Sequence, residues 1–117
     1  MRYKFGDKYG YGKPYVFIHP HKQSIVKHIV DSMPDWVDYA IVFGSSVQPY
    51  CKPASDVDIC IIGAYKKGIH CIDLWDIEDV DIIHHNSKED FLSSLKDNPH
   101  SATSEAYNKG VVVYAKG

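Results

Sequence analysis

The sequence contains no run of eighteen or more apolar residues, so it offers no candidate for a membrane-spanning helix. Its first residues are polar and aromatic and lack the apolar segment of a signal peptide. Cysteine is scarce: Cys51, Cys60 and Cys71 are an odd number and lack the close paired spacing of a zinc site. These absences predict a cytoplasmic protein with reduced thiols and no membrane partner.

The sequence also lacks an excess of either charge, with a net charge of −2 when the histidines are neutral. Nucleic acid is therefore not an expected partner, because non-specific binding to its phosphates needs a basic surface. Seven of the fifteen acidic residues nonetheless lie between Asp56 and Asp81. Such a compact acidic region suits metal ions better than it suits DNA.

The 117 residues are enough for one hydrophobic core, so we predict a single domain over residues 1–117. Residues 1–20 form its N-terminal arm, which is aromatic and basic and includes a candidate edge strand at 16–18. We interpret the arm as a segment that wraps the domain or a partner. A stacking platform for nucleic-acid bases is the alternative.

Two apolar stretches at the centre of the chain carry the candidate chemistry. The first ends in Gly44-Ser45, and the second opens with Asp56-Val57-Asp58. Side chains alternate along a strand, so the two carboxylates point the same way while Val57 points into a core. Two carboxylates on one face repel each other unless a cation lies between them. Mg²⁺ prefers such oxygen ligands and completes its shell with water and substrate phosphates, so the pair predicts a metal and a phosphate.

The Gly44-Ser45 pair predicts where the phosphate would bind. A sharp turn after Phe43, followed by a helical turn near Ser46, would leave free backbone N–H groups that bind a phosphate. Gly44 would let the phosphate approach the backbone closely, and Ser45 would add a hydroxyl donor.

Apolar periodicity and capping residues predict the remaining elements of an α/β domain of the α+β type. They are an amphipathic helix over 23–33, strands over 36–43, 56–62, 79–85 and 111–114, a helix capped by Asn86 or Ser87 and broken at Asn98-Pro99, and a helix over 101–109 that stops at Gly110. Residues 69–75 fit either an extended segment or the start of a short helix.

The strand over 79–85 carries a third carboxylate. Asp81 lies between Val80 and Ile82, and these apolar neighbours on both sides would fix it in the middle of the strand. We therefore prefer Asp81 as the partner of the central pair. Asp79, which shares its face, and Asp73 are the alternatives.

Taken in order, these motifs resemble the nucleotidyltransferase superfamily related to DNA polymerase β: an apolar strand, Gly44-Ser45, a loop, Asp56-Val57-Asp58 and then Val80-Asp81-Ile82. From about residue 22 onward, the chain is most similar to the minimal nucleotidyltransferases that pair with HEPN-domain proteins. The ending Lys-Gly-Val-Val-Val-Tyr after a helix also resembles them. The resemblance implies a nucleotidyltransferase fold, with a small mixed sheet and helices packed on one face.

By this resemblance, the chain transfers a nucleoside monophosphate from an NTP, with ATP expected, to an acceptor hydroxyl. Asp56, Asp58 and Asp81 would be the catalytic carboxylates that hold two Mg²⁺ ions. Asp81 would also help to draw the proton from the acceptor. Such catalysis rests on positioning and charge neutralisation.

The nucleotide would bind through Gly44, Ser45, Ser46 and Lys52. One departure from the family is visible, because Gln48 stands where the minimal family commonly has an arginine. The change removes a cation that would neutralise triphosphate charge. Either Lys52 replaces that cation or catalysis is weakened.

The resemblance further implies a partner. The acceptor would be a tyrosine of a HEPN-type toxin, and the chain would act as its antitoxin. A binding-only antitoxin or regulatory subunit with a vestigial site is one alternative. A small-molecule transferase of the antibiotic-modifying type is another, and it would need its acceptor site from a second chain. A protein partner or a homo-oligomer is therefore expected.

Overall fold

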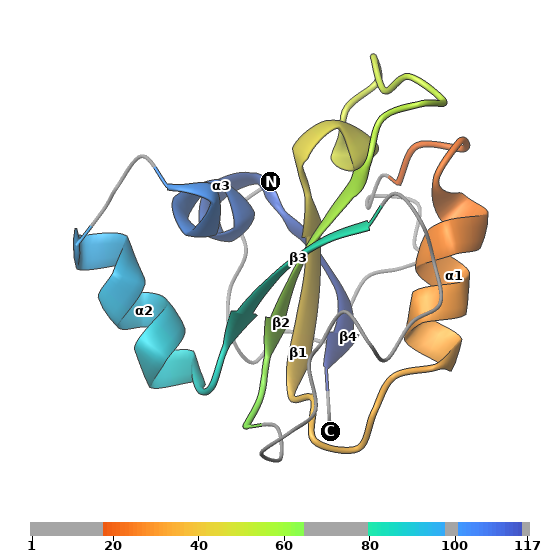
Figure 1. Ribbon diagram of the computed structural model, residues 1–117. Helices are drawn as coiled ribbons and strands as arrows, with labels where there is room; N and C mark the ends of the chain where they lie inside the picture. Colours follow the sequence, from red (N-terminus) through yellow and green to blue (C-terminus); the bar gives the residue numbers. More distant parts are fainter. Residues whose placement is uncertain (1–17, 65–79, 98–100, 116–117) are drawn as a thin grey trace.

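The computed structural model describes residues 18–64, 80–97 and 101–115 (Figure 1). The elements in these ranges are α1 (Gln23–Asp31), β1 (Tyr39–Phe43), the 3-10 helix η1 (Gly44–Val47), β2 (Val57–Ile62), β3 (Val80–His85), α2 (Lys88–Asp97), α3 (Ala102–Lys109) and β4 (Val111–Ala115). Asp73, Asp79, most of the N-terminal arm and the ambiguous segment 69–75 lie outside the described residues.

The four strands form one mixed sheet in the order β3-β2-β1-β4. β1 is antiparallel to both β2 and β4, whereas β2 and β3 run parallel. This arrangement confirms the predicted α/β fold with a small mixed sheet. The strand predicted from Trp36 begins later, at Tyr39, because the chain first turns, with the Val37 N–H donating to the Pro34 carbonyl at 3.2 Å.

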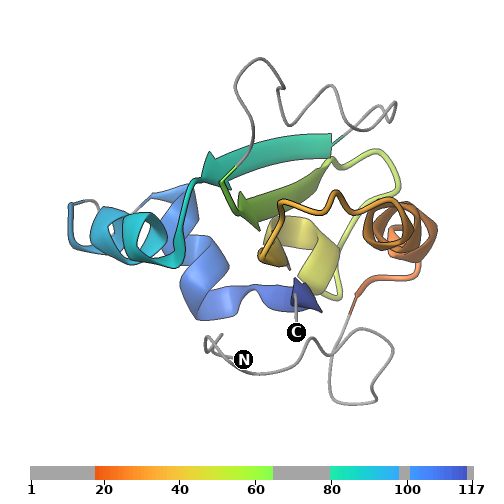
Figure 2. The same cartoon turned by 90° about the horizontal axis from the view of Figure 1, so that it is seen from below.

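The helices cover both faces of the sheet, as Figures 1 and 2 show from two directions. On one face, Val26 and Ile29 of α1 pack in a cluster with Val42 of β1. On the other face, Phe91 of α2 and Ala106 of α3 belong to a second cluster. The prediction that the helices pack on one face is therefore wrong.

The reason lies in the central strands, which are apolar on both sides. Ala40 and Val42 face the α1 cluster, whereas Ile41 and Phe43 belong to the cluster under α2 and α3. The same alternation continues along β2, where only Asp58 interrupts the buried pattern. A strand with apolar side chains in both directions must be covered on both faces.

Of the two predicted cap candidates of α2, Asn86 and Ser87, the structure uses Ser87, and Ser101, the predicted first residue of the last helix, is its N-cap. The Ser87 hydroxyl accepts the Asp90 N–H at 3.1 Å, and the Ser101 hydroxyl accepts the Ser104 N–H at 3.2 Å. Such caps satisfy N–H groups that lack an intrahelical partner. None of the helices within the described ranges has the length and apolar character needed to cross a membrane.

Phe91 anchors α2 to the sheet. It is fully buried, and its ring lies 5.5 Å from the ring of His85 and 6.1 Å from that of Tyr107, measured between centroids. We expect Phe91→Ala to lower the free energy of unfolding by about 3–5 kcal/mol, because it opens a cavity in the second core. Urea unfolding measures this loss. The matched control Leu92→Ala, at a half-buried neighbour, should cost clearly less, and equal costs would contradict the assignment of Phe91 as the anchor.

Candidate active site

β1 ends at a glycine that the local backbone requires. Gly44 has a φ of 74°, in the left-handed region that other residues rarely adopt, and here the extended strand turns into η1. A Cβ on Gly44 would also overlap the Oδ2 atom of Asp58. The backbone that was predicted to bind phosphate therefore lies directly against a carboxylate that was predicted to bind metal.

The sheet brings two of the predicted carboxylates together. The parallel register of β2 and β3 places Asp58 opposite Asp81. Both face the side of the sheet that carries α2 and α3, because Val57 and Ile59 lie in the opposite cluster. The negative charge of Asp81 acts on the Asp58 carboxyl group. Asp56, exposed just before β2, adds a third negative charge.

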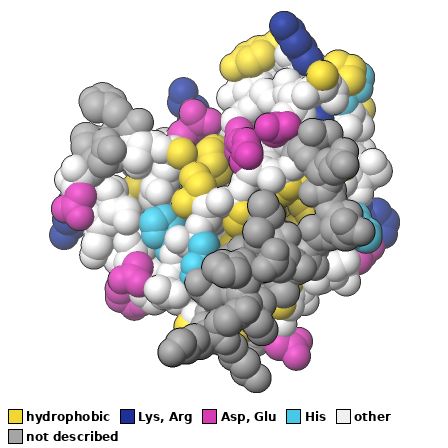
Figure 3. Space-filling model, viewed as in Figure 1, with side chains coloured by type: hydrophobic (Ala, Val, Ile, Leu, Met, Phe, Trp, Pro, Cys, Tyr) yellow, Lys and Arg dark blue, Asp and Glu magenta, His cyan; other side chains and the backbone are white. Residues whose placement is uncertain are grey.

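Among these carboxyl groups, the pKa of Asp58 is shifted. Its pKa is raised from the usual 3.8 to about 6, first by burial and then by the negative charges of Asp81, Glu105 and Asp56. Neighbouring carboxylates raise a pKa because they penalise the charged form. Figure 3 shows acidic side chains gathered on the face of the molecule that carries β3. A cation bound among these groups would relieve the repulsion.

Glu105, a contributor to this field, was not predicted from the sequence. It lies on α3, in a helix that the sequence identified only as a structural element. The buried neighbours Ser104 and Ala106 leave Glu105 on the exposed face. An exposed glutamate on an amphipathic helix is usually a solvated charge, so only the packing of α3 beside η1 and β2 indicates a further role.

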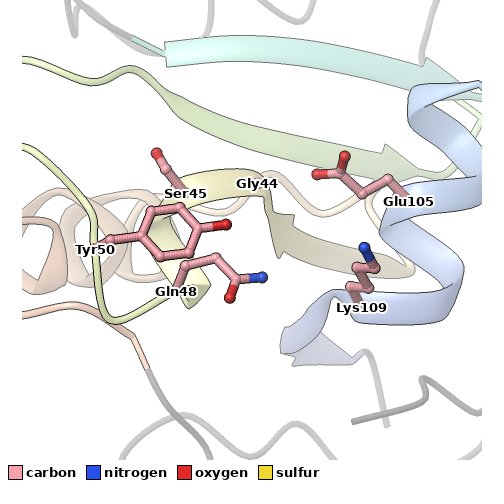
Figure 4. A pocket seen from close by; sticks show the side chains of 6 residues that line it. All are labelled: Gly44, Ser45, Gln48, Tyr50, Glu105 and Lys109. Atoms are coloured by element: carbon pink, nitrogen blue, oxygen red, sulfur yellow. The ribbon is translucent and has the colours of Figure 1, made fainter.

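A hollow of about 240 Å³ opens next to Gly44. It is lined by residues from the segment 44–55, which was predicted to bind phosphate and is called the phosphate loop below, and from α3. These residues face each other in Figure 4: Gly44, Ser45, Gln48, Tyr50, Glu105 and Lys109. Tyr50 and Lys109 were not among the predicted site residues. Tyr50 is 71 % exposed, so its ring is open to solvent at the edge of the hollow.

Two of the predicted nucleotide-binding residues, Ser46 and Lys52, do not line the hollow. Ser46 is fully buried, and its hydroxyl has no hydrogen-bond partner within the described part of the chain. Lys52 is exposed in the loop and does not line the hollow. Ser45 does, and its hydroxyl accepts a long contact of 3.8 Å from the Cys51 thiol.

Residues 18–22 hold the loop in place from the side of α1. The His19 N–H donates to the Ser46 carbonyl at 2.8 Å, which fixes η1. Lys22 is only 2 % exposed, and its Nζ donates to the Pro53 carbonyl at 3.0 Å. The loop is therefore tied down both near its start and near the Asp-Val-Asp motif.

The chemistry of the carboxylates fits a hard divalent cation. Asp56, Asp58 and Asp81 offer only oxygen donors, as Mg²⁺ prefers, and their mutual repulsion favours a positive charge. Across the described residues, no group of three or more histidine, cysteine, aspartate or glutamate side chains is already arranged as a metal site. The match between these carboxylates and Mg²⁺ therefore rests on the type of donor atom and on charge.

A turn at Gly44-Ser45 beside paired carboxylates, on a four-stranded mixed sheet, is the arrangement of a nucleotidyl-transferring domain. The family model described as "Polymerase beta, Nucleotidyltransferase" matches residues 25–117 of this chain. The chain belongs to this family, whose general function is nucleotidyl transfer with a nucleoside triphosphate as substrate. No curated protein matches the chain in sequence.

The contact between Gly44 and Asp58 can be tested by substitution. We expect Gly44→Ala to destabilise the fold by about 1–3 kcal/mol, because alanine is strained at this φ, with a further cost from overlap with Asp58. In a double-mutant cycle, Gly44→Ala should cost less stability in the Asp58→Ala background than in the wild-type chain. Additive losses, measured by urea unfolding, would contradict a close contact.

The raised pKa of Asp58 predicts a pH-dependent stability in metal-free buffer. Ionisation of Asp58 destabilises the folded state, so this loss is absent below pH 4 and complete above about pH 6. Asp58→Asn should therefore stabilise the chain at pH 7.5, by about 1 kcal/mol since solvent screens a partly buried carboxylate, and change little at pH 4. Urea unfolding in EDTA at both pH values measures the difference. A gain that is the same at both pH values would show that ionisation of Asp58 is not its cause.

Proposed function

We propose that this chain is a Mg²⁺-dependent nucleotidyltransferase that moves a nucleoside monophosphate from an NTP, with ATP expected, to a hydroxyl on a partner protein. The observation that carries the proposal is the direct approach of the Gly44 backbone to the Asp58 carboxylate. It makes the phosphate loop and the carboxylates parts of one site. Family membership supports the same reaction class.

Each of the chain's own groups has a role in this proposal. Asp56, Asp58 and Asp81 would hold the metal, and the cation would keep Asp58 ionised despite its neighbours. When bound, Mg²⁺ supplies charge neutralisation at the attacking and leaving oxygens. Gly44 and Ser45 orient the phosphates with a backbone N–H and a hydroxyl.

We assign acceptance of the acceptor's proton to Asp81, as the sequence resemblance implies. Asp81 is exposed on β3, the end strand of the four described strands, whereas Asp58 is partly enclosed. A hydroxyl from a second molecule can therefore approach Asp81 from solvent. Proton transfer to a positioned carboxylate assists attack on the α-phosphorus atom.

For the acceptor, we propose a hydroxyl of a HEPN-type toxin, with the chain acting as antitoxin in the cytoplasm. The sequence resemblance to the minimal nucleotidyltransferases supports this choice. A homo-oligomer that completes the acceptor site is the other form we consider.

A second candidate function is a binding-only antitoxin or regulatory subunit. It is favoured by one observation: Gln48, which replaces the family's arginine, lines the hollow where phosphate charge would lie. Loss of that cation would weaken nucleotide binding without affecting a surface that covers a partner. Metal-dependent binding of nucleotide separates the two candidates.

Calorimetric titration of the chain with each of the four NTPs, in Mg²⁺ and in EDTA, tests the proposal. We expect binding that requires Mg²⁺ and that Asp56→Asn/Asp58→Asn abolishes, because the variant loses two of the oxygen ligands. The control Asp35→Asn/Asp38→Asn removes two exposed carboxylates from the opposite end of β1 and should bind normally.

Two outcomes would count against nucleotidyl transfer. Binding that persists unchanged in EDTA and in the Asp56→Asn/Asp58→Asn variant would mean that the carboxylates do not form the site. Failure of the folded wild-type chain to bind any NTP would favour the binding-only function.

A further inference from the structure

The wall of the hollow that α3 forms carries side chains of opposite charge. Glu105 and Lys109 both line it, one helical turn apart on the exposed face of the helix. Glu105 lies on the side of the carboxylates, since its charge acts on Asp58. Lys109 lies at the C-terminal end of α3, one turn beyond it, as Figure 4 shows.

The position of Lys109 is fixed by the sheet. β4 follows α3 directly and pairs with β1 so that Val111 lies opposite Val42 and Val112 opposite Ile41. The ladder ends at the pair Val42–Val111, beyond which β1 leads into η1 and β4 is preceded by the end of α3. Gly44 and Lys109 both line the hollow, so the phosphate turn and the end of α3 meet there.

Gly110 makes this close approach possible. A Cβ on Gly110 would overlap the Ile41 side chain and the Ala106 carbonyl, so any larger residue would push the end of α3 away from β1. The glycine lets the last turn of α3 lie against the strand. Lys109, the residue before it, is thereby held at the rim of the hollow.

Lys109 is the only cationic side chain among the six described residues that line the hollow. Its ammonium group makes no ion pair or hydrogen bond with the described part of the chain, and this includes Glu105 at i−4. It is therefore available to an anion. Lys52, the cation expected from the sequence, does not line the hollow.

We propose that Lys109 binds the β- or γ-phosphate of the nucleoside triphosphate, and so supplies from α3 the charge that Gln48 fails to supply from the loop. Gln48 lies across the hollow and adds a neutral amide donor. This inference rests on the proposed function and names a further residue that would bind the phosphates of its NTP substrate. A lysine ammonium, with three donors on a flexible stem, is well suited to a phosphate.

The test compares the affinities of the full chain and its variants for ATP and AMP, by calorimetry in Mg²⁺. We expect Lys109→Gln to weaken ATP binding by about tenfold, the usual effect of losing one charge-assisted hydrogen bond. AMP affinity should stay within about twofold, since AMP lacks the phosphates that Lys109 contacts. Lys109→Arg should retain most of the ATP affinity.

Two further variants sharpen the comparison. The matched control Lys96→Gln removes an exposed lysine from the last turn of α2, and it should leave both affinities unchanged. Adding Gln48→Arg to Lys109→Gln should restore ATP binding, because the family's arginine would then return a cation to the same hollow. Equal urea midpoints for the variants exclude a loss caused by unfolding.

The outcomes distinguish this inference from the function on which it rests. If the wild-type chain binds ATP and Lys109→Gln binds it equally well, the inference is overturned and the proposed function stands. Equal losses for ATP and AMP would also overturn it, as would a larger loss in Lys52→Gln. If the wild-type chain binds no nucleotide, both fail together.

Discussion

The close approach of Gly44 to Asp58 is the constraint on which the site depends. Phe43 pairs with Asp58 at the last rung of the β1–β2 ladder, so the chain must turn away from the sheet immediately beside a carboxylate. Only a residue without a Cβ fits there, and the left-handed φ of Gly44 starts η1 at the same point. A single backbone geometry therefore sets the distance between the groups that would hold phosphate and those that would hold metal.

The negative charge around Asp58 favours the binding of a cation. Burial and the charges of Asp81, Glu105 and Asp56 act on Asp58, which resists ionisation as a result. A domain selected only for stability would not keep such a group half-buried against its neighbours. Perturbed carboxylates of this kind cluster at functional sites, where substrate or metal removes the repulsion. Glu105 gives the hollow an acidic end and Lys109 a cationic end. In the proposed function, a polyphosphate would lie along the line between them.

Much of the fold could be predicted from the sequence because its signals are local. Alternating residues identified β2, and the two C-terminal helices were expected to start at Asn86 or Ser87 and at Ser101. The position of Asp81 opposite Asp58 required the parallel register, which non-local packing sets. Glu105 and Lys109 were missed for the same reason: their place beside η1 depends on how β4 pairs with β1. The helix cover on both faces follows from the apolar strands, yet the sequence does not say which helix covers which face.

Lys22 and His19 hold the phosphate loop in an ordered conformation before any ligand binds. Both Lys22 and His19 lie before residue 25, where the match to the family begins, yet each holds part of the phosphate loop. A loop that is already ordered loses less conformational entropy when a ligand binds. The order of this loop thus comes in part from residues outside the family match, so under the proposed function a chain trimmed to that boundary would keep every proposed ligand and bind the nucleotide more weakly.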